Sequence, residues 1–193
     1  MGMSYFTNPL VFALNTVFSF YIGAVMLRFL LQWVRADFRN PISKFLITIT
    51  HPLLKILRRF IPAMGNIDTA SIVLMLALQI LATGSVAFLQ GGFFAISIGG
   101  VILTAFAQLL SLLLNVMFYA IFARALLSWF QQGTYNDFSM LLYSLTEPML
   151  RVCRGMVPNL GGLDLSVILA IFGLQLAEML LLPPLYQLAS LIS

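Results

Sequence analysis

The residues with the clearest chemical potential in this sequence are arginines that stand inside apolar stretches. Arg28 and Arg124 each lie five residues before a tryptophan, near the end of a long apolar run. A guanidinium holds phosphate groups and carbonyl oxygens through a planar fork of N–H donors, which a lysine cannot reproduce. We expect both side chains either to reach the headgroup region by snorkelling or to form a lipid headgroup site or a clamp on a helix end.

The other basic residues gather in two segments, 35–68 and 131–164. Asp68 and Asp164 close these segments where the next apolar run begins, and we expect each carboxylate either to cap that helix or to pair with Arg58 or Arg154. Cationic side chains of this kind bind anionic headgroups or acidic partners. The candidate lipid-binding or partner-binding residues are Arg28, Lys55, Arg58, Arg59, Arg124, Arg151 and Arg154.

Three polar side chains, Gln79, Gln175 and Glu178, lie within apolar stretches and are candidates for an intramembrane pathway. Amides at such a depth commonly join helices by hydrogen bonds, and the alternative is that they line a path between two halves of the protein. Glu178 is expected near the outer interface, either as a solvated carboxylate or as a proton or cation site. Asn115 and Asn15 are its candidate partners.

No pattern in the sequence indicates an enzyme, a metal site or a cofactor. His51 is the only histidine, so a haem with two histidine ligands from one chain is excluded, and only His with Met, or His from two chains, would hold iron. Cys153 is the only cysteine, which excludes an intramolecular disulfide and a cysteine-rich zinc site. Catalytic triads, glycine-rich phosphate loops and zinc-protease motifs are absent from the sequence.

The composition indicates that lipid is the main solvent of this chain. Of its 193 residues, 61% are apolar and 8% are charged, and the mean hydropathy is +1.02. A soluble domain carries about 25% charged residues, so a cytosolic globular protein and a disordered chain are both excluded. The formal charge of +4 therefore indicates membrane orientation and not nucleic-acid binding.

Four stretches are long and apolar enough to cross a bilayer, residues 9–34, 69–90, 104–130 and 165–182. The third belongs to a longer run, which we expect to bend at Gly99-Gly100 and leave a short interfacial piece over 93–103. Pro183-Pro184 is expected to end the fourth. The positive-inside rule predicts that the loops 35–68 and 131–164 are cytoplasmic and that both termini lie outside.

The sequence contains one unit written twice, with an offset of 96 residues. Each unit has two crossings, so the halves should be related by an axis along the membrane normal. We place repeat one at about 9–90 and repeat two at about 104–186, within a single membrane domain 1–193. The repeated residues are Arg28, Trp33, Asn40, Thr50, Pro52, Arg58, Pro62, Gly65, Asp68 and Gln79, matched by Arg124, Trp129, Asn136, Thr146, Pro148, Arg154, Pro158, Gly161, Asp164 and Gln175.

Each loop also carries apolar residues at the helical spacing i, i+3, i+4, i+7, with polar and basic residues between them. Such a segment is typical of an amphipathic helix that lies flat in the membrane interface. Pro52 and Pro148 stand inside these segments and should kink each helix or divide it into two.

The two segments THPLLKILRRFIPAMGNID (50–68) and TEPMLRVCRGMVPNLGGLD (146–164) resemble the YggT/YlmG family of small integral membrane proteins. The resemblance covers essentially the whole chain, although Gly155 replaces the second arginine of the pair in the second copy. It implies a bacterial inner membrane or a thylakoid membrane and no established enzymatic activity. It also implies a link to the assembly or distribution of membrane complexes, haem-protein maturation among them, and to ion or osmotic homeostasis.

The sequence therefore predicts an all-α membrane protein with four transmembrane helices, arranged as two tandem parallel hairpins with amphipathic segments at the cytoplasmic face. Two functions remain open. One is a scaffold or assembly factor that binds anionic lipid or an unidentified membrane protein complex. The other is a small ion or osmolyte channel or transporter, which as a homo-oligomer would build a path from few polar residues per subunit.

Overall fold

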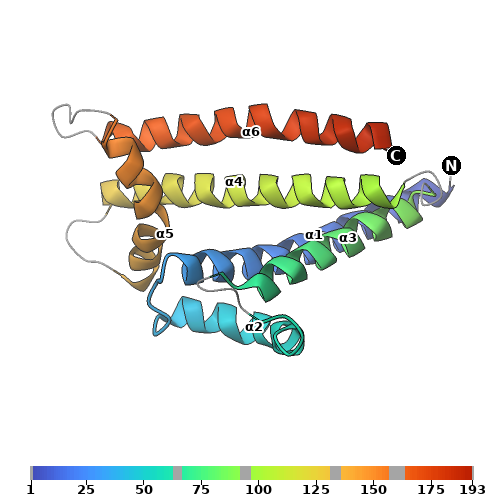
Figure 1. The fold of residues 1–193 in the computed structure, drawn as a ribbon, viewed down its shortest axis with the longest axis horizontal. Coiled ribbons are helices and arrows are strands. Elements are labelled where there is room, and N and C mark those ends of the chain that lie inside the picture. Colours follow the sequence, from blue (N-terminus) through green and yellow to red (C-terminus); the bar gives the residue numbers. More distant parts are fainter. Residues whose placement is uncertain (1, 63–66, 92–96, 131–135, 157–163, 193) are drawn as a thin grey trace.

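A computed structural model describes residues 2–62, 67–91, 97–130, 136–156 and 164–192, and all regular structure in these ranges except one isolated bridge residue is helical. The helices are α1 (Gly2–Trp33), α2 (Pro41–Leu57), α3 (Thr69–Leu89), α4 (Ile98–Phe130), α5 (Asp137–Arg154) and α6 (Leu165–Ile192). Four long helices run lengthwise, with α1 and α3 inclined to α4 and α6, and the two shorter helices lie at the end away from both termini, which we call the basic end (Figure 1).

The four long helices are the predicted crossings. Candidate spans cover Thr7–Trp33, Thr69–Leu89, Ile98–Ser128 and Leu165–Ile192. The chain reverses between α1 and α3 and again between α4 and α6, so each repeat is a hairpin, and the two hairpins run in the same sense (Figure 1). The fold class predicted from the sequence is confirmed, while the side of the membrane on which the basic end lies stays a prediction.

Two predicted helix boundaries are wrong. α4 begins at Ile98, so Gly99-Gly100 stand in its first turn and do not separate it from an interfacial piece that reaches residue 103, and a Cβ at Gly99 would meet the Ile192 side chain at 3.1 Å. This glycine therefore permits close packing of α4 on the end of α6, where Ser97 Oγ donates to the Ile192 carbonyl at 2.5 Å. The rest of the predicted piece over 93–103 lies partly outside the described residues.

The second wrong boundary is the end of α6, which runs through Pro183-Pro184 to Ile192. A proline removes one backbone donor and crowds the preceding turn. In a bilayer, however, a helix that stopped there would leave several backbone groups without partners, at a larger cost than the lost bonds. The continuation places Glu178 about 20 Å from either end of α6 at 1.5 Å per residue, so it lies at mid-helix, while its position near the outer interface stays a prediction.

The turn after α1 folds the chain back so that α2 can lie across the bundle. The Ala36 N–H donates to the Leu31 carbonyl at 2.9 Å and the Arg35 N–H to the Gln32 carbonyl at 3.1 Å, the bonding pattern of a Schellman motif. Arg35 takes the left-handed conformation that this motif requires, with φ of 54°. Five residues after Arg35, Asn40 caps α2 by accepting from the Ile42 N–H at 2.9 Å.

The equivalent asparagine in repeat two begins α5. Asn136 and Ser139 form a capping box, in which each side chain accepts from the other residue's backbone N–H. The Asn40 side chain also donates to the Asp137 carbonyl at 2.6 Å. This bond joins the starts of α2 and α5, so the two repeats meet at the caps of their amphipathic helices.

Pro52 and Pro148 lie inside α2 and α5, and both helices continue past them. Of the two predicted outcomes, a kink or a division into two short helices, the division is therefore excluded. The axis of α2 does change direction along its length (Figure 1), as expected for a proline that clashes with the preceding turn.

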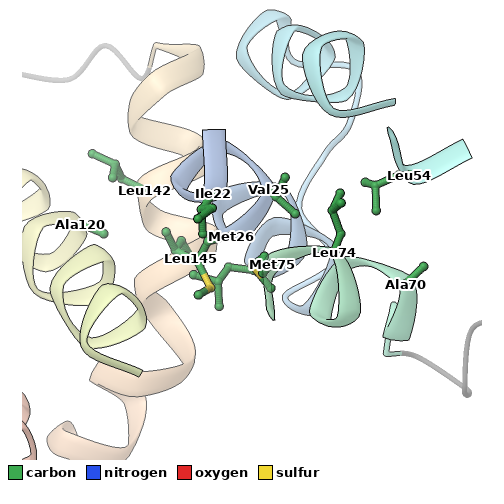
Figure 2. Packing of buried hydrophobic residues seen from close by; sticks show 11 residues of the cluster. Ile22, Val25, Met26, Leu54, Ala70, Leu74, Met75, Ala120, Leu142 and Leu145 are labelled. Carbon is green, nitrogen blue, oxygen red and sulfur yellow. The ribbon is translucent and has the colours of Figure 1, made fainter. Parts of the chain in front are cut away.

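The core lies toward the basic end and is shared by both repeats. Figure 2 shows Ile22 and Met26 of α1 beside Met75 of α3 and Leu145 of α5. A second cluster belongs to repeat two alone and consists of Ile121, Leu150, Cys153, Ala170 and Leu174. Leu54 in the first cluster and Leu150 in the second are repeat equivalents, and both are completely buried. Each amphipathic helix is thus anchored to its own hairpin by an equivalent leucine.

Labelling of single cysteines tests this topology in a Cys153→Ser background. Lys44→Cys and Met140→Cys lie exposed on α2 and α5, and Ser190→Cys lies exposed near the end of α6. With a membrane-impermeant maleimide on intact cells, we expect Ser190→Cys to react and the other two to react only after permeabilisation. Reaction of all three from one side would contradict four crossings, and an exchange of sides would reverse only the orientation.

Candidate functional site

Arg28 lies on α1 and binds the middle of α2. Its side chain is buried, and Nη1 donates to Thr50 Oγ1 at 2.7 Å and lies 3.5 Å from the Ile47 carbonyl. Thr50 is completely buried and in turn donates to the Leu46 carbonyl. The structure therefore excludes a snorkelling side chain and supports the clamp, which grips the middle of α2 and not its end.

Arg124 makes the same contact in repeat two. Nη1 of this buried residue donates to Thr146 Oγ1 at 2.9 Å. Two further groups complete its surroundings: the Glu147 carboxylate accepts from Nη2 at 2.9 Å, and the guanidinium carbon lies 4.2 Å from the centre of the Tyr143 ring. Because the carboxylate and the ring both stabilise the cation, Arg124 has more partners than Arg28.

Asp68 forms an ion pair with Arg58, at 2.5 Å between Oδ2 and Nη2. It stands at the N-terminus of α3 but makes no side-chain capping bond, so capping by Asp68 is a wrong prediction and pairing with Arg58 is confirmed. Burial raises the pKa of this carboxyl, but hydrogen bonds from Arg58 and Ser71 outweigh burial and lower the pKa below its usual value. Its other oxygen, Oδ1, is buried with no hydrogen-bond partner among the described residues.

Asp164 performs both predicted roles. It caps α6 by accepting from the Ser166 N–H at 3.1 Å, and it pairs with Arg154 at 3.2 Å. Glu147 also binds Arg154, at 2.8 Å, so this carboxylate bridges Arg124 and Arg154. Burial raises the pKa of Glu147, yet the hydrogen bond from Arg124 and the charge of Arg154 lower it overall.

Three candidate cations remain on the surface of the basic end. Lys55, Arg59 and Arg151 are exposed, and none of them forms a salt bridge with a described residue. Large apolar side chains are exposed beside them on the same helices or directly after them, namely Phe45, Ile56 and Phe60 of repeat one and Val152 and Met156 of repeat two. This mixture of cations and apolar groups is suited to a membrane interface.

The other repeated residues serve the structure in different ways. Trp33 and Pro62 are exposed, as are the prolines inside α2 and α5. Exposure of Trp33 at the end of α1 suits an aromatic belt residue. Gly65, Pro158, Gly161 and the side chain of Trp129 lie outside the described residues.

The three predicted pathway residues do not come together. Gln79 Nε2 donates to Gln108 Oε1 at 2.6 Å, and this hydrogen bond between side-chain amides joins α3 to α4. Gln175 is exposed on the outside of α6, and Glu178 faces α4, where Oε1 lies 3.4 Å from both Asn115 Nδ2 and Ser111 Oγ. Asn115 is thus confirmed as a partner of Glu178. Among the described residues, no group of three or more His, Cys, Asp or Glu is placed to hold a metal ion.

Sequence reasoning missed three functional contacts. The repeat counterparts of Gln108 and Tyr143 are Phe12 and Ile47, neither of which can make the same contact, so the duplication did not point to them. The capping role of Asn40 and Asn136 could have been predicted from the sequence. An Asn directly before Pro41 and an Asn three residues before Ser139 are both capping signatures. The contact of Asn40 with Asp137 depends on tertiary structure alone.

The CCB3/YggT family model matches the chain twice, at residues 7–89 and 103–185. The chain belongs to the CCB3/YggT family. The two matches are separated by the same offset as the repeat found in the sequence, so each repeat corresponds to one copy of the family domain. No solved structure matches the chain.

Curated relatives cover nearly the whole chain. The uncharacterized protein PA0392 of Pseudomonas aeruginosa is 41% identical over 89% of this chain and 87% of its own length. An uncharacterized protein of Vibrio alginolyticus, named from the region 3' of proC, is 39% identical over 90% of this chain and 94% of its own length. The uncharacterized protein YggT of Escherichia coli K12 is 34% identical over 89% of this chain and 88% of its own length. These relatives support a bacterial multi-pass membrane protein.

The clamp between α1 and α2 is tested by removing its acceptor. Thr50→Val keeps the shape of the side chain but leaves the buried Arg28 without its shortest bond, so we expect a loss of about 1.5–3 kcal/mol in unfolding free energy. Thr48→Val is the matched control, because Thr48 is an exposed residue of the same helix, and it should change the value by less than about 0.5 kcal/mol. Unfolding in detergent micelles measures both, and equal effects would argue against the clamp.

Proposed function

We propose that this protein is a non-enzymatic membrane scaffold whose basic end holds anionic lipid or a protein partner during the organisation of membrane complexes. The observation that carries the proposal is the repeated arginine clamp. Arg28 and Arg124 fix α2 and α5 across the end of the bundle through Thr50 and Thr146. The clamp buries a charge in each hairpin to hold a surface in place, which is what a binding platform requires and a permeation path does not.

The surface that these clamps present carries uncompensated positive charge. Arg58 and Arg154 are neutralised by their aspartates, whereas Lys55, Arg59 and Arg151 are exposed beside exposed apolar side chains. Each cation near an anionic membrane surface contributes about 1 kcal/mol of attraction at low ionic strength. A partner with an acidic surface would be held by the same cations and would show the same dependence on salt.

These contacts also determine which substitutions test the proposal. Arg58→Ala and Arg154→Ala would remove ion pairs that support the turns before α3 and α6, so a loss of binding could reflect misfolding. The exposed residues Lys55, Arg59 and Arg151 are better targets. We expect the triple replacement of these residues by Gln to weaken binding to vesicles that contain phosphatidylglycerol by about 100-fold at low salt, with insertion unchanged.

The matched control keeps the charge, as Lys55→Arg with Arg59→Lys and Arg151→Lys, and should bind as the parent does. Co-purification of membrane proteins with both variants, after crosslinking, tests the protein-partner form of the proposal. If the neutral triple variant keeps both its lipid and its co-purifying proteins, the basic surface is not a binding platform and the scaffold proposal fails.

A second candidate function, ion transport, is favoured by the position of Glu178. This carboxylate lies at mid-helix between α4 and α6 with Asn115 and Ser111 around it, and ionisable groups at such a depth commonly mark proton or cation pathways. In liposomes, transport would require that Glu178→Gln abolish flux. Gln79→Leu combined with Gln175→Leu serves as the comparison, because Gln79 joins two helices and Gln175 faces outward. Absence of flux from folded, inserted protein would reject this function.

A further inference from the structure

The two repeats offer an internal comparison of one site in two chemical states. Around each clamp, four positions are occupied by the same residue types, namely Arg28, Thr50, Arg58 and Asp68 in repeat one and Arg124, Thr146, Arg154 and Asp164 in repeat two. Two neighbouring positions differ: His51 stands where repeat two has Glu147, and Ile47 stands where repeat two has Tyr143. The consequences of these two differences can be followed in the contacts.

In repeat two, the chain supplies its own anion to the arginine pair. One oxygen of Glu147 lies 2.9 Å from Arg124 Nη2 and the other lies 2.8 Å from Arg154 Nη1. The Tyr143 ring covers the Arg124 guanidinium. With Asp164 included, two guanidinium groups meet two carboxylates, and the formal charge of the cluster is zero. A carboxylate bridging two forked donors occupies the place that a phosphate group would take.

In repeat one, that anion is missing from the chain. His51 is exposed, and among the described residues Arg28 donates hydrogen bonds through Nη1 alone. Asp68 is the only carboxylate among the described residues that pairs with Arg58, so two guanidinium groups meet one carboxylate there and the cluster keeps one formal positive charge. Because the positions and the residue types of the donors are conserved between the repeats, the difference lies in the anion.

A cavity of about 460 Å³ lies beside Arg28 and Arg58, and its other lining residues are Gln32, Phe38, Ile47, Ile61 and Asp68. Its walls combine two cations, one carboxylate that is paired with Arg58, and an amide with three large apolar side chains. Arg28 lies five residues before the end of α1, about 8 Å along the helix, which is the depth of the headgroup and acyl boundary for a helix that ends at the interface. A charged group with an apolar continuation, placed at this depth, matches a phospholipid.

We propose that the repeat-one cavity binds a phosphate group, that of an anionic phospholipid, in the place where repeat two holds its own Glu147 carboxylate. Arg28 donates through the edge of its guanidinium that does not bind Thr50, and Arg58 donates from the opposite side while it stays paired with Asp68. Phe38, Ile47 and Ile61 contact the glycerol and the first methylenes. This proposal deepens the scaffold function and rests on it for the location of the basic end at a membrane surface.

The test introduces into repeat one, at position 51, the carboxylate that repeat two carries at Glu147. His51→Glu should place an anion between Arg28 and Arg58 and exclude the lipid, and His51→Gln is the matched neutral control. Native mass spectrometry of protein released from nanodiscs that contain phosphatidylglycerol and phosphatidylcholine counts the retained lipid. We expect the parent and His51→Gln to retain one phosphatidylglycerol molecule. For His51→Glu, the ratio of lipid-bound to lipid-free protein should fall at least about tenfold.

Folding does not confound this experiment, because His51 is exposed and the new carboxylate would meet two cations, so His51→Glu should unfold at the same or a higher temperature. Glu147→Gln provides the converse arm and should gain a second retained lipid. Equal retention by His51→Glu and His51→Gln would overturn the proposal. Calorimetric titration of lipid-free protein with inorganic phosphate separates the sources: phosphate binding that His51→Glu abolishes, without lipid retention, would assign the cavity to a free phosphate.

The result can be told apart from failure of the scaffold function itself. The neutral variant at Lys55, Arg59 and Arg151 leaves the cavity residues in place and tests the outer surface, whereas His51→Glu leaves those three cations in place and tests the cavity. Loss of vesicle binding in the first variant together with unchanged lipid count in the second would retain the scaffold and reject the phosphate site.

Discussion

Each hairpin of this protein depends on a buried arginine that must find an acceptor on another helix. A guanidinium without partners in a membrane protein core is costly, and Thr50 and Thr146 supply the short bonds that offset the cost. Since these threonines are buried within α2 and α5, the amphipathic helices are held at fixed positions across the bundle. Without the clamp, α2 and α5 would keep their apolar contacts with the bundle but would lose the buried hydrogen bond that fixes the middle of each helix.

Most of the architecture followed from the sequence because its signals are strong and local. Apolar length determined the four crossings, and the duplication determined that both hairpins run in the same sense. The wrong helix boundaries arose where tertiary packing or the lipid environment overrode a local sequence rule. Gly99 was read as a hinge but serves close packing against Ile192, and Pro183-Pro184 was read as a stop although lipid disfavours an unfinished helix.

The candidate site was predictable in its residue types but not in its geometry. The repeated arginines and aspartates could be named, yet whether Arg28 snorkels or binds Thr50 depends on how α2 packs, which no spacing in the sequence reveals. The burial of Arg28 and its bond to Thr50 decide this question, and the contact of Arg124 with the Tyr143 ring depends on packing in the same way. Gln79 and Gln175 are equivalent in sequence but not in environment, because Gln108 exists only opposite the first of them.

The Glu147 bridge between Arg124 and Arg154 has a consequence for valency. A duplicated unit placed about an axis normal to the membrane would, with identical sites, be bivalent and could link ligands on its two sides into a chain or a lattice. One internal carboxylate removes that option at the second position and breaks the equivalence of the halves. The two sides of the molecule then differ within the plane of the membrane. Because it has one such site, a contact made through that site does not extend to further molecules.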